Sequence, residues 1–331
     1  MKKQLSIGDA PIKYLLKFYI PLMITFKQSD EVEEWFHHSF ILTKTKIHKS
    51  KSWTIVNDYN PYVSRVRCLG LSAKILKKNT VMKLLKNLIN NNYYISLNLD
   101  FFYLKNSFAF QKLHFNHQIL LYGYDDEKER IYLCGYCFGS KIRCIEIDTN
   151  SFLNSFFSCN HNNVWVYKRR KKKKINFNMK SFYLGIKSYA TSTYPLIYQI
   201  RTKNFSFSNK ERYGIDVHIE LKTKLINDIN DEKSDIKLRI YCYMEMAQCM
   251  VIRLDYIRKN KLLKDIDKII YGFNELKKKY DIMLRLYMKY MITNDKNILC
   301  KVIDIEDELL KEEKNLYTNL YNKIQQQYSF K

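Results

Sequence analysis

The pattern of apolar and polar positions divides the chain into a half with short strands and a half with long helices. Residues 79–92 carry apolar side chains three or four positions apart, which predicts an amphipathic helix. Short apolar or alternating runs predict strands at 93–100, 118–124, 130–136, 141–147 and 163–168. The second and third of these runs flank the polar stretch DDEKE, so they are expected to pair as an antiparallel hairpin.

Helical periods dominate the rest of the chain. They extend over 212–228, 235–260, 262–292 and 297–328 and predict an antiparallel helical bundle. Nearer the N-terminus, an apolar patch at 12–26 predicts a helix, and SDEVEEW predicts the start of another, with Ser29 as its cap. The seven basic residues KRRKKKK at 168–174 are expected to mark a domain boundary, so the predicted domains are 1–170 (α+β) and 171–331 (helical).

The charge of the chain narrows the classes of partner. Its 57 Lys and Arg against 33 Asp and Glu give a net charge of +24, which suits nucleic acid, an anionic membrane surface or an acidic protein. No apolar run is long enough for a membrane span, and the N-terminal residues lack the apolar region of a secretory signal. The eight cysteines are therefore expected to be reduced thiols in a cytoplasmic protein.

The chain offers few motifs of known chemistry. It has no phosphate loop and no dinucleotide fingerprint, so no bound cofactor is expected. Cys134 and Cys137 form a CxxC, but no second pair follows at zinc spacing. On a strand, residues three apart face opposite sides. Buried thiols are therefore a better interpretation than a metal or redox site.

His117 is the strongest candidate for catalysis. In the segment HFNH, His114 and His117 stand just before a predicted strand. One interpretation is a pair of histidines at a strand edge. The other is that His117 acts as general base toward a thiol supplied by a different element. The first cysteine of the chain is Cys68, whose neighbours Arg65 and Arg67 favour a thiolate.

The stretch NHQILLYGYDDEKERIYL carries a family resemblance. His117, Gly123, Tyr124 and Asp125 match a pattern H-x5-G-Y-D, and the segment LNLDFFYL with Asp100 precedes it. Together these residues resemble the N-terminal domain family of butirosin biosynthesis protein H, which has a papain-like, C39-peptidase-like fold. The resemblance covers about residues 80–260.

The resemblance implies both a fold and an activity. The fold is a papain-like antiparallel sheet with N-terminal helices, followed by a mostly helical domain. The activity is acyl transfer in nonribosomal peptide or polyketide-type biosynthesis, with a phosphopantetheine-linked acyl group on an acidic carrier protein as substrate. The family cysteine lies on the first helix, and an aspartate that orients the histidine ends the strand after the hairpin. Here the first cysteine is Cys68, and Gly135 stands at the place of that aspartate.

These departures leave the enzymatic status open between two hypotheses. In the first, Cys68 and His117 form a relocated catalytic pair. In the second, the chain is a non-catalytic pseudoenzyme that binds an acidic carrier protein or another partner. Nucleic-acid binding is a third alternative, because tyrosines and basic residues are abundant enough for base stacking.

Overall fold

The chain forms two compact units. Unit 1 comprises Met1–Lys13, Phe18–Val32 and Asn60–Lys174, and unit 2 comprises Tyr14–Lys17, Glu33–Tyr59 and Ile175–Lys331. The computed structural model describes residues 1–9, 19–25, 30–39, 41, 43–48, 51–56, 63–71, 77–105, 107–136, 142–159, 162–170, 175–193, 212–229 and 236–330. The expected division is 1–170 and 171–331, whereas residues 14–17 and 33–59 belong to unit 2 and unit 1 extends to Lys174.

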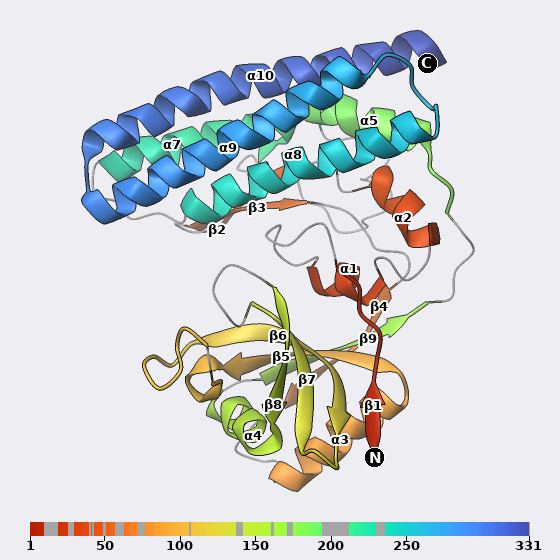
Figure 1. Cartoon of the computed structure of the whole chain (residues 1–331), viewed down its shortest axis with the longest axis vertical. Coiled ribbons are helices and arrows are strands. Elements are labelled where there is room, and N and C mark those ends of the chain that lie inside the picture. The colour runs from red at the N-terminus through yellow and green to blue at the C-terminus, as the bar shows by residue number, and fades with distance from the viewer. Residues whose placement is uncertain are drawn as a thin grey trace. The chain divides into compact units, whose positions relative to one another are not determined.

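Unit 1 is built on one antiparallel sheet (Figure 1). Its strands are β1 (Lys2–Gln4), β4 (Val63–Leu71), β5 (Tyr93–Asp100), β6 (Asn116–Asp125), β7 (Arg130–Gly135), β8 (Arg143–Asp148) and β9 (Asn162–Arg169). Their order is β4-β9-β5-β6-β7-β8, with β1 paired to β6. The five predicted strands, including the hairpin around DDEKE, are confirmed. Strands β1 and β4 have no counterpart in the sequence prediction.

Four short helical segments accompany this sheet. They are α1 (Tyr19–Thr25), α3 (Lys78–Asn90), the 3-10 turn η1 (Phe101–Tyr103) and α4 (Thr149–Ser158). The predicted helix at 79–92 is confirmed as α3, which buries Val81, Leu85 and Ile89. Asp148 caps the N-terminus of α4, because its side chain accepts a hydrogen bond from the Ser151 backbone and so satisfies one N–H group of the first turn.

Gly123 of the H-x5-G-Y-D pattern has a structural role. A Cβ added there would lie 2.6 Å from the Lys3 carbonyl oxygen and 2.9 Å from the Tyr132 ring. Strand β1 pairs with β6 at this point, with Gln4 opposite Gly123. The glycine therefore permits the N-terminal strand to join the sheet beside β6.

Unit 2 is mostly helical. It contains part of α2 (Asp30–His37), a small sheet of β2 (Thr43–His48), β3 (Lys51–Val56) and β10 (Arg212–Tyr213), and then α5 (Met179–Ala190), η2 (Gly214–Asp216), α7 (Val217–Ile229), α8 (Ile236–Lys259), α9 (Asp267–Thr293) and α10 (Lys296–Tyr328). The predicted C-terminal helices are confirmed, and so is the broader prediction of an antiparallel sheet followed by a helical region. Ser29, the expected cap of α2, lies outside the described residues.

One predicted helix begins later than expected. The helical prediction started at residue 212, but Arg212 and Tyr213 form β10 and α7 starts only at Val217. The cause is Gly214, whose φ of +54° interrupts the helical backbone. A Cβ on this glycine would lie 2.3 Å from the Tyr189 carbonyl oxygen, so the close approach also requires glycine.

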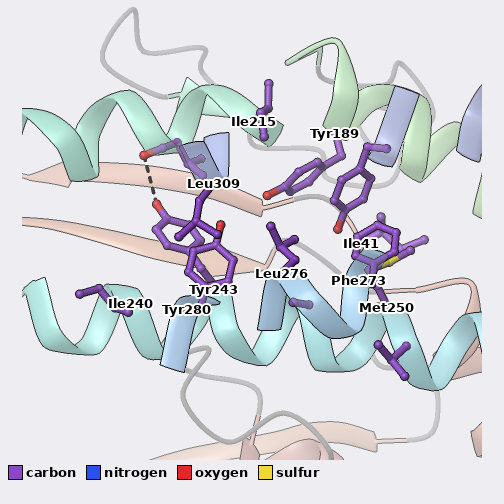
Figure 2. Close-up of a cluster of buried hydrophobic side chains, with 14 of the residues drawn as sticks. Ile41, Tyr189, Ile215, Ile240, Tyr243, Met250, Phe273, Leu276, Tyr280 and Leu309 are labelled. Carbon is purple, nitrogen blue, oxygen red and sulfur yellow. Dashed lines mark hydrogen bonds between the residues drawn. The ribbon is translucent and has the colours of Figure 1, made fainter. Parts of the chain in front are cut away.

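A charged group lies in the apolar core of unit 2. Figure 2 shows Tyr189, Tyr243 and Tyr280 among aliphatic side chains of that core. Beside them is His218, whose Nδ1 is 2.7 Å from Glu306 Oε1 and whose Nε2 is 3.2 Å from Glu313 Oε2.

Glu313 also accepts hydrogen bonds from the hydroxyls of Tyr189 and Tyr280. Burial alone would lower the pKa of His218, but the two carboxylates raise it to about 10. The imidazole is therefore held as a cation between α7 and α10.

This ion group predicts a stability loss at alkaline pH. Because folding raises the pKa of His218, its stabilising contribution is complete below about pH 6.5 and is lost as the pH rises toward about 10. We expect the free energy of unfolding of unit 2 to fall across this window by up to about 1.4 kcal/mol per pH unit. Urea unfolding followed by helical circular dichroism at several pH values measures this slope.

The matched variants are His218→Gln and, as a control on an exposed histidine, His114→Gln. His218→Gln is expected to lose about 3 kcal/mol at neutral pH, because it leaves two buried carboxylates without a cation, and to flatten the slope. His114→Gln should keep the wild-type slope. Equal slopes in wild type and His218→Gln would contradict a buried imidazolium.

Candidate functional site

His117 lies at the start of β6 in an aromatic environment. The centroids of three rings lie 5.7–6.1 Å from its own, those of Phe101, Phe115 and Tyr136. Its Nδ1 is 3.0 Å from the Gln118 carbonyl oxygen, which can only accept, so Nδ1 carries the proton and Nε2 the lone pair. Burial lowers the pKa of His117, and the ring is neutral at physiological pH.

A tyrosine of the N-terminal helix approaches the same carbonyl. Tyr19, the first residue of α1, donates its hydroxyl hydrogen to Gln118 O at 3.1 Å. Its ring is 5.4 Å from the Tyr136 ring, which in turn contacts His117. The Tyr19 hydroxyl of α1 and His117 Nδ1 thus both contact the Gln118 carbonyl oxygen.

The sheet does not bring Cys68 and His117 together. Cys68 of β4 lies opposite Trp165 of β9, Trp165 opposite Ser96 of β5, and Ser96 opposite Leu120 of β6. Three strand spacings of about 4.8 Å separate β4 from β6, or about 14 Å. His117 is three residues farther along β6, or about 10 Å. The two backbones are therefore about 17 Å apart, beyond the reach of a thiol–imidazole hydrogen bond. The Cys68 side chain itself lies outside the described residues.

The carboxylate that orients a histidine is Asp100, at the end of β5. Gly135, at the place where the family pattern puts an aspartate, ends β7 without a side chain. The carboxylate of Asp100 is buried, and its Oδ1 accepts from the backbone nitrogens of Phe102 and Phe115, both at 3.1 Å. Its Oδ2 lies 2.6 Å from His114 Nδ1 and accepts from Ser158 Oγ at 2.7 Å.

His114 is therefore the histidine that is paired with a carboxylate. Its side chain is 64% exposed, against 2% for Asp100, and its ring stacks on Phe102 at 4.4 Å. Since the ionised carboxylate only accepts, His114 Nδ1 donates, and in the neutral form of this largely exposed ring the lone pair is on Nε2. An imidazole held in this way can accept a proton as a general base. Ser158 donates to the aspartate, so the order of contacts is Ser–Asp–His rather than the Ser–His–Asp of a hydrolytic triad.

Hydrogen bonds keep Asp100 ionised. Burial alone would raise the pKa of its carboxyl, but the bonds from Ser158, His114 and two backbone N–H groups outweigh this and lower the pKa. The sequence signal for this site was the pair of histidines in HFNH and an aspartate that ends a strand. The sequence pattern predicts His117 as the catalytic histidine and does not predict the contact between Asp100 and His114.

Cys159, which lies near Asp100, is not activated. Cys159 donates to Asn116 Oδ1 at 3.3 Å, and burial, with Asp100 nearby, raises the pKa of its thiol to about 12. Cys137 of the CxxC lies outside the described residues. Within the described part of the chain, no three His, Cys, Asp or Glu side chains are grouped as a metal ion requires. In that same part, no helix is long and apolar enough to cross a membrane.

A cluster of basic residues lies where β4 begins and β9 ends. We call it the basic edge and define it as Arg65, Lys168, Arg169 and Arg170, all of them exposed. Arg65 lies over the Trp165 ring at 4.1 Å, and Lys168 lies over the Tyr93 ring at 5.1 Å. The basic edge contains the first three residues of KRRKKKK, and residues 171–174 lie outside the described residues.

Comparisons with known proteins provide no further assignment. Neither the models of known protein families nor the curated protein sequences contain a match to this chain. The features that bear on function are the geometry of the two histidines, the sheet register and the charge of the surface.

Replacing Asp100 with asparagine tests its role. Because hydrogen bonds lower the pKa of Asp100, its stabilising contribution is present above about pH 3.9 and is lost as the pH falls through the folded-state pKa. At neutral pH, Asp100→Asn places an amide against buried donors and should cost about 2 kcal/mol of unfolding free energy.

The variant should also remove the preference of the His114 ring for the tautomer with the proton on Nδ1. In the wild type, the nitrogen chemical shifts of its ring should report a protonated Nδ1, and in Asp100→Asn they should move toward a mixture of tautomers. The ring of His117 serves as the internal control, because Gln118 O orients it independently. Unchanged His114 shifts in Asp100→Asn would show that the carboxylate does not orient this ring.

Proposed function

We propose that the chain is a binding protein for an acidic carrier protein, and a non-catalytic relative of the N-terminal domain family of butirosin biosynthesis protein H. The observation that carries the proposal is the sheet register, which separates Cys68 from His117 by three strand spacings. A thiol and an imidazole so far apart cannot form the activated pair that acyl transfer through a cysteine requires.

The surroundings of His117 support both parts of the proposal, the relation to this family and the lack of catalysis. The resemblance implies a first helix that brings its nucleophile to the histidine strand. Here helix α1 does approach the start of β6, but it presents Tyr19, whose hydroxyl donates to Gln118 O. The antiparallel sheet and the hairpin after His117 also agree with a papain-like fold. On this proposal, a phenol replaces the thiol beside a histidine that the fold has retained.

The basic edge is the surface that suits an acidic partner. Four exposed cations lie at this end of β4 and β9, with Lys168 on the opposite face of the sheet from Arg65 and Arg169, on a chain with a net charge of +24. On each face a half-buried ring adds apolar area to the charge, that of Trp165 beneath Arg65 and that of Tyr93 beneath Lys168. Carrier proteins are acidic around the serine that bears the phosphopantetheine arm, so the two surfaces are complementary. Such complementarity accelerates association and weakens as salt is added.

A second candidate function is acyl transfer with His114 as general base. The specific observation in its favour is Asp100, which fixes the Nδ1–H tautomer of His114 and leaves Nε2 on an exposed ring. In this candidate, the imidazole would take a proton from an acceptor amine that attacks the thioester of a carrier-bound acyl group directly. The C–S bond would break as the amide forms, and the phosphopantetheine sulfur would leave and take up the proton. No cysteine of this chain would then carry the acyl group.

The binding proposal predicts a charge-dependent complex. We expect a phosphopantetheine-loaded acyl carrier protein to bind, and the double variant Lys168→Glu/Arg170→Glu to bind about tenfold more weakly, mainly through slower association. Titration calorimetry and stopped-flow association at low and high salt measure both effects.

The control reverses two exposed lysines of α10, Lys301→Glu/Lys311→Glu, and so changes the net charge equally. It should alter the affinity less than twofold at moderate salt. Equal weakening by both double variants, or equal binding of random duplex DNA, would refute docking of a carrier protein at the basic edge.

An acylation assay distinguishes the two candidates. The chain is mixed with acyl-loaded carrier protein and an amine acceptor, and both the protein mass and the amide product are measured. Neither product is expected if the chain only binds. Amide formation that disappears in His114→Gln but persists in Cys68→Ala would support the second candidate. Acyl mass on Cys68 that disappears in His117→Gln would contradict both.

A further inference from the structure

We propose that Cys134 and Cys144 form a dithiol site that is converted to a cross-strand disulfide by exchange with small disulfide molecules. Strands β7 and β8 place the two residues directly opposite each other. Their sulfur atoms are 3.1 Å apart, and neither is in a disulfide. Opposite residues in an antiparallel pair have Cα atoms about 4.5–5.5 Å apart, within the range that a disulfide spans. Bond formation therefore requires little movement of the backbone.

The two thiols differ in a way that suits exchange. Cys144 is exposed on β8, the last strand in the sheet order, whereas Cys134 is buried. The hydrogen bond between the sulfurs lowers the pKa of Cys144 to about 7, against the opposing effects of burial and of Asp9. A second hydrogen bond, with Tyr122, acts in the same direction. Cys144 is then partly thiolate at neutral pH, which is the form that attacks a disulfide.

The reaction proceeds in two balanced steps. The Cys144 thiolate attacks one sulfur of a small disulfide, RSSR, and forms a mixed disulfide as RS⁻ departs. Cys134 loses its proton and attacks the Cys144 sulfur, which releases the second RS⁻ and forms the bond between Cys134 and Cys144. The protein loses two protons and two electrons in all, and the small disulfide takes them up and is reduced to two thiols.

The fold selects a partner for Cys134 that the sequence motif does not indicate. The CxxC pairs Cys134 with Cys137 along the chain, but the register of the hairpin pairs it with Cys144 across the strands. The bond would join the edge strand β8 to β7 near the ends of the connection between them. Reduction would break this link. The fraction of protein that carries the disulfide would therefore depend on the ratio of small disulfides to thiols in solution.

The test uses the full chain and oxidised glutathione as the small disulfide. After oxidation, free thiols are blocked and the intact mass is measured, followed by digestion with trypsin without reduction. Cleavage at Lys141 and Arg143 separates Cys134, in peptide 131–141, from Cys144, in peptide 144–168. Cys137 lies in the first peptide and Cys159 in the second, so fragmentation assigns the linked residues.

The proposal predicts a loss of two hydrogens and a link between the two peptides at Cys134 and Cys144. Cys134→Ser should instead retain glutathione on Cys144, and Cys144→Ser should slow oxidation at least tenfold. Cys137→Ser, Cys159→Ser and Cys300→Ser should form the same link as the wild type. Cys300, an exposed thiol on α10, is the control for exposure alone. A link within peptide 131–141, or a stable glutathione adduct on wild-type Cys144, would overturn the proposal.

Discussion

Backbone hydrogen bonds across β4, β9, β5 and β6 determine which residues of unit 1 can meet. A strand spacing of about 4.8 Å cannot be compressed, so a residue on β4 stays about 14 Å from β6 whatever its side chain does. The same register has opposite consequences elsewhere in the sheet. It separates Cys68 from His117, and it places Cys134 against Cys144. The chemistry open to unit 1 follows from this geometry more than from the types of residue present.

Within that frame, the two histidines of HFNH have different partners. Asp100 binds the end of β5 to η1, to His114 and, through Ser158, to α4, so its carboxylate orients an imidazole and also joins three segments. His117 is held instead by a backbone carbonyl that Tyr19 shares. Unit 2 uses a buried ion group in a comparable way, with His218 as a cation between carboxylates of α10. In all three cases the groups bound to the ring determine which of its nitrogens carry a proton.

Much of the fold could be predicted from hydrophobic periodicity, but much of the site could not. The hairpin of β6 and β7 and helices α8, α9 and α10 have clear periods, so their existence was predictable. Strand β4 was missed because VSRVRCLGL places two arginines among its apolar residues. The contact between Asp100 and His114 joins residues fourteen positions apart, and it depends on how η1 and the following loop turn. Periodicity carries no information on such a turn, nor on the register that pairs Cys134 with Cys144.

Our central conclusion is that His117 does not act as general base toward the Cys68 thiol. The most direct measurement is the alkylation rate of Cys68 by iodoacetamide across a range of pH, followed by peptide mass spectrometry in the wild type and in His117→Gln. The register predicts the same rate profile in both proteins, within about twofold, because an imidazole about 17 Å away cannot change the thiolate fraction appreciably. A rate that falls tenfold or more in His117→Gln would contradict the account and restore the catalytic pair.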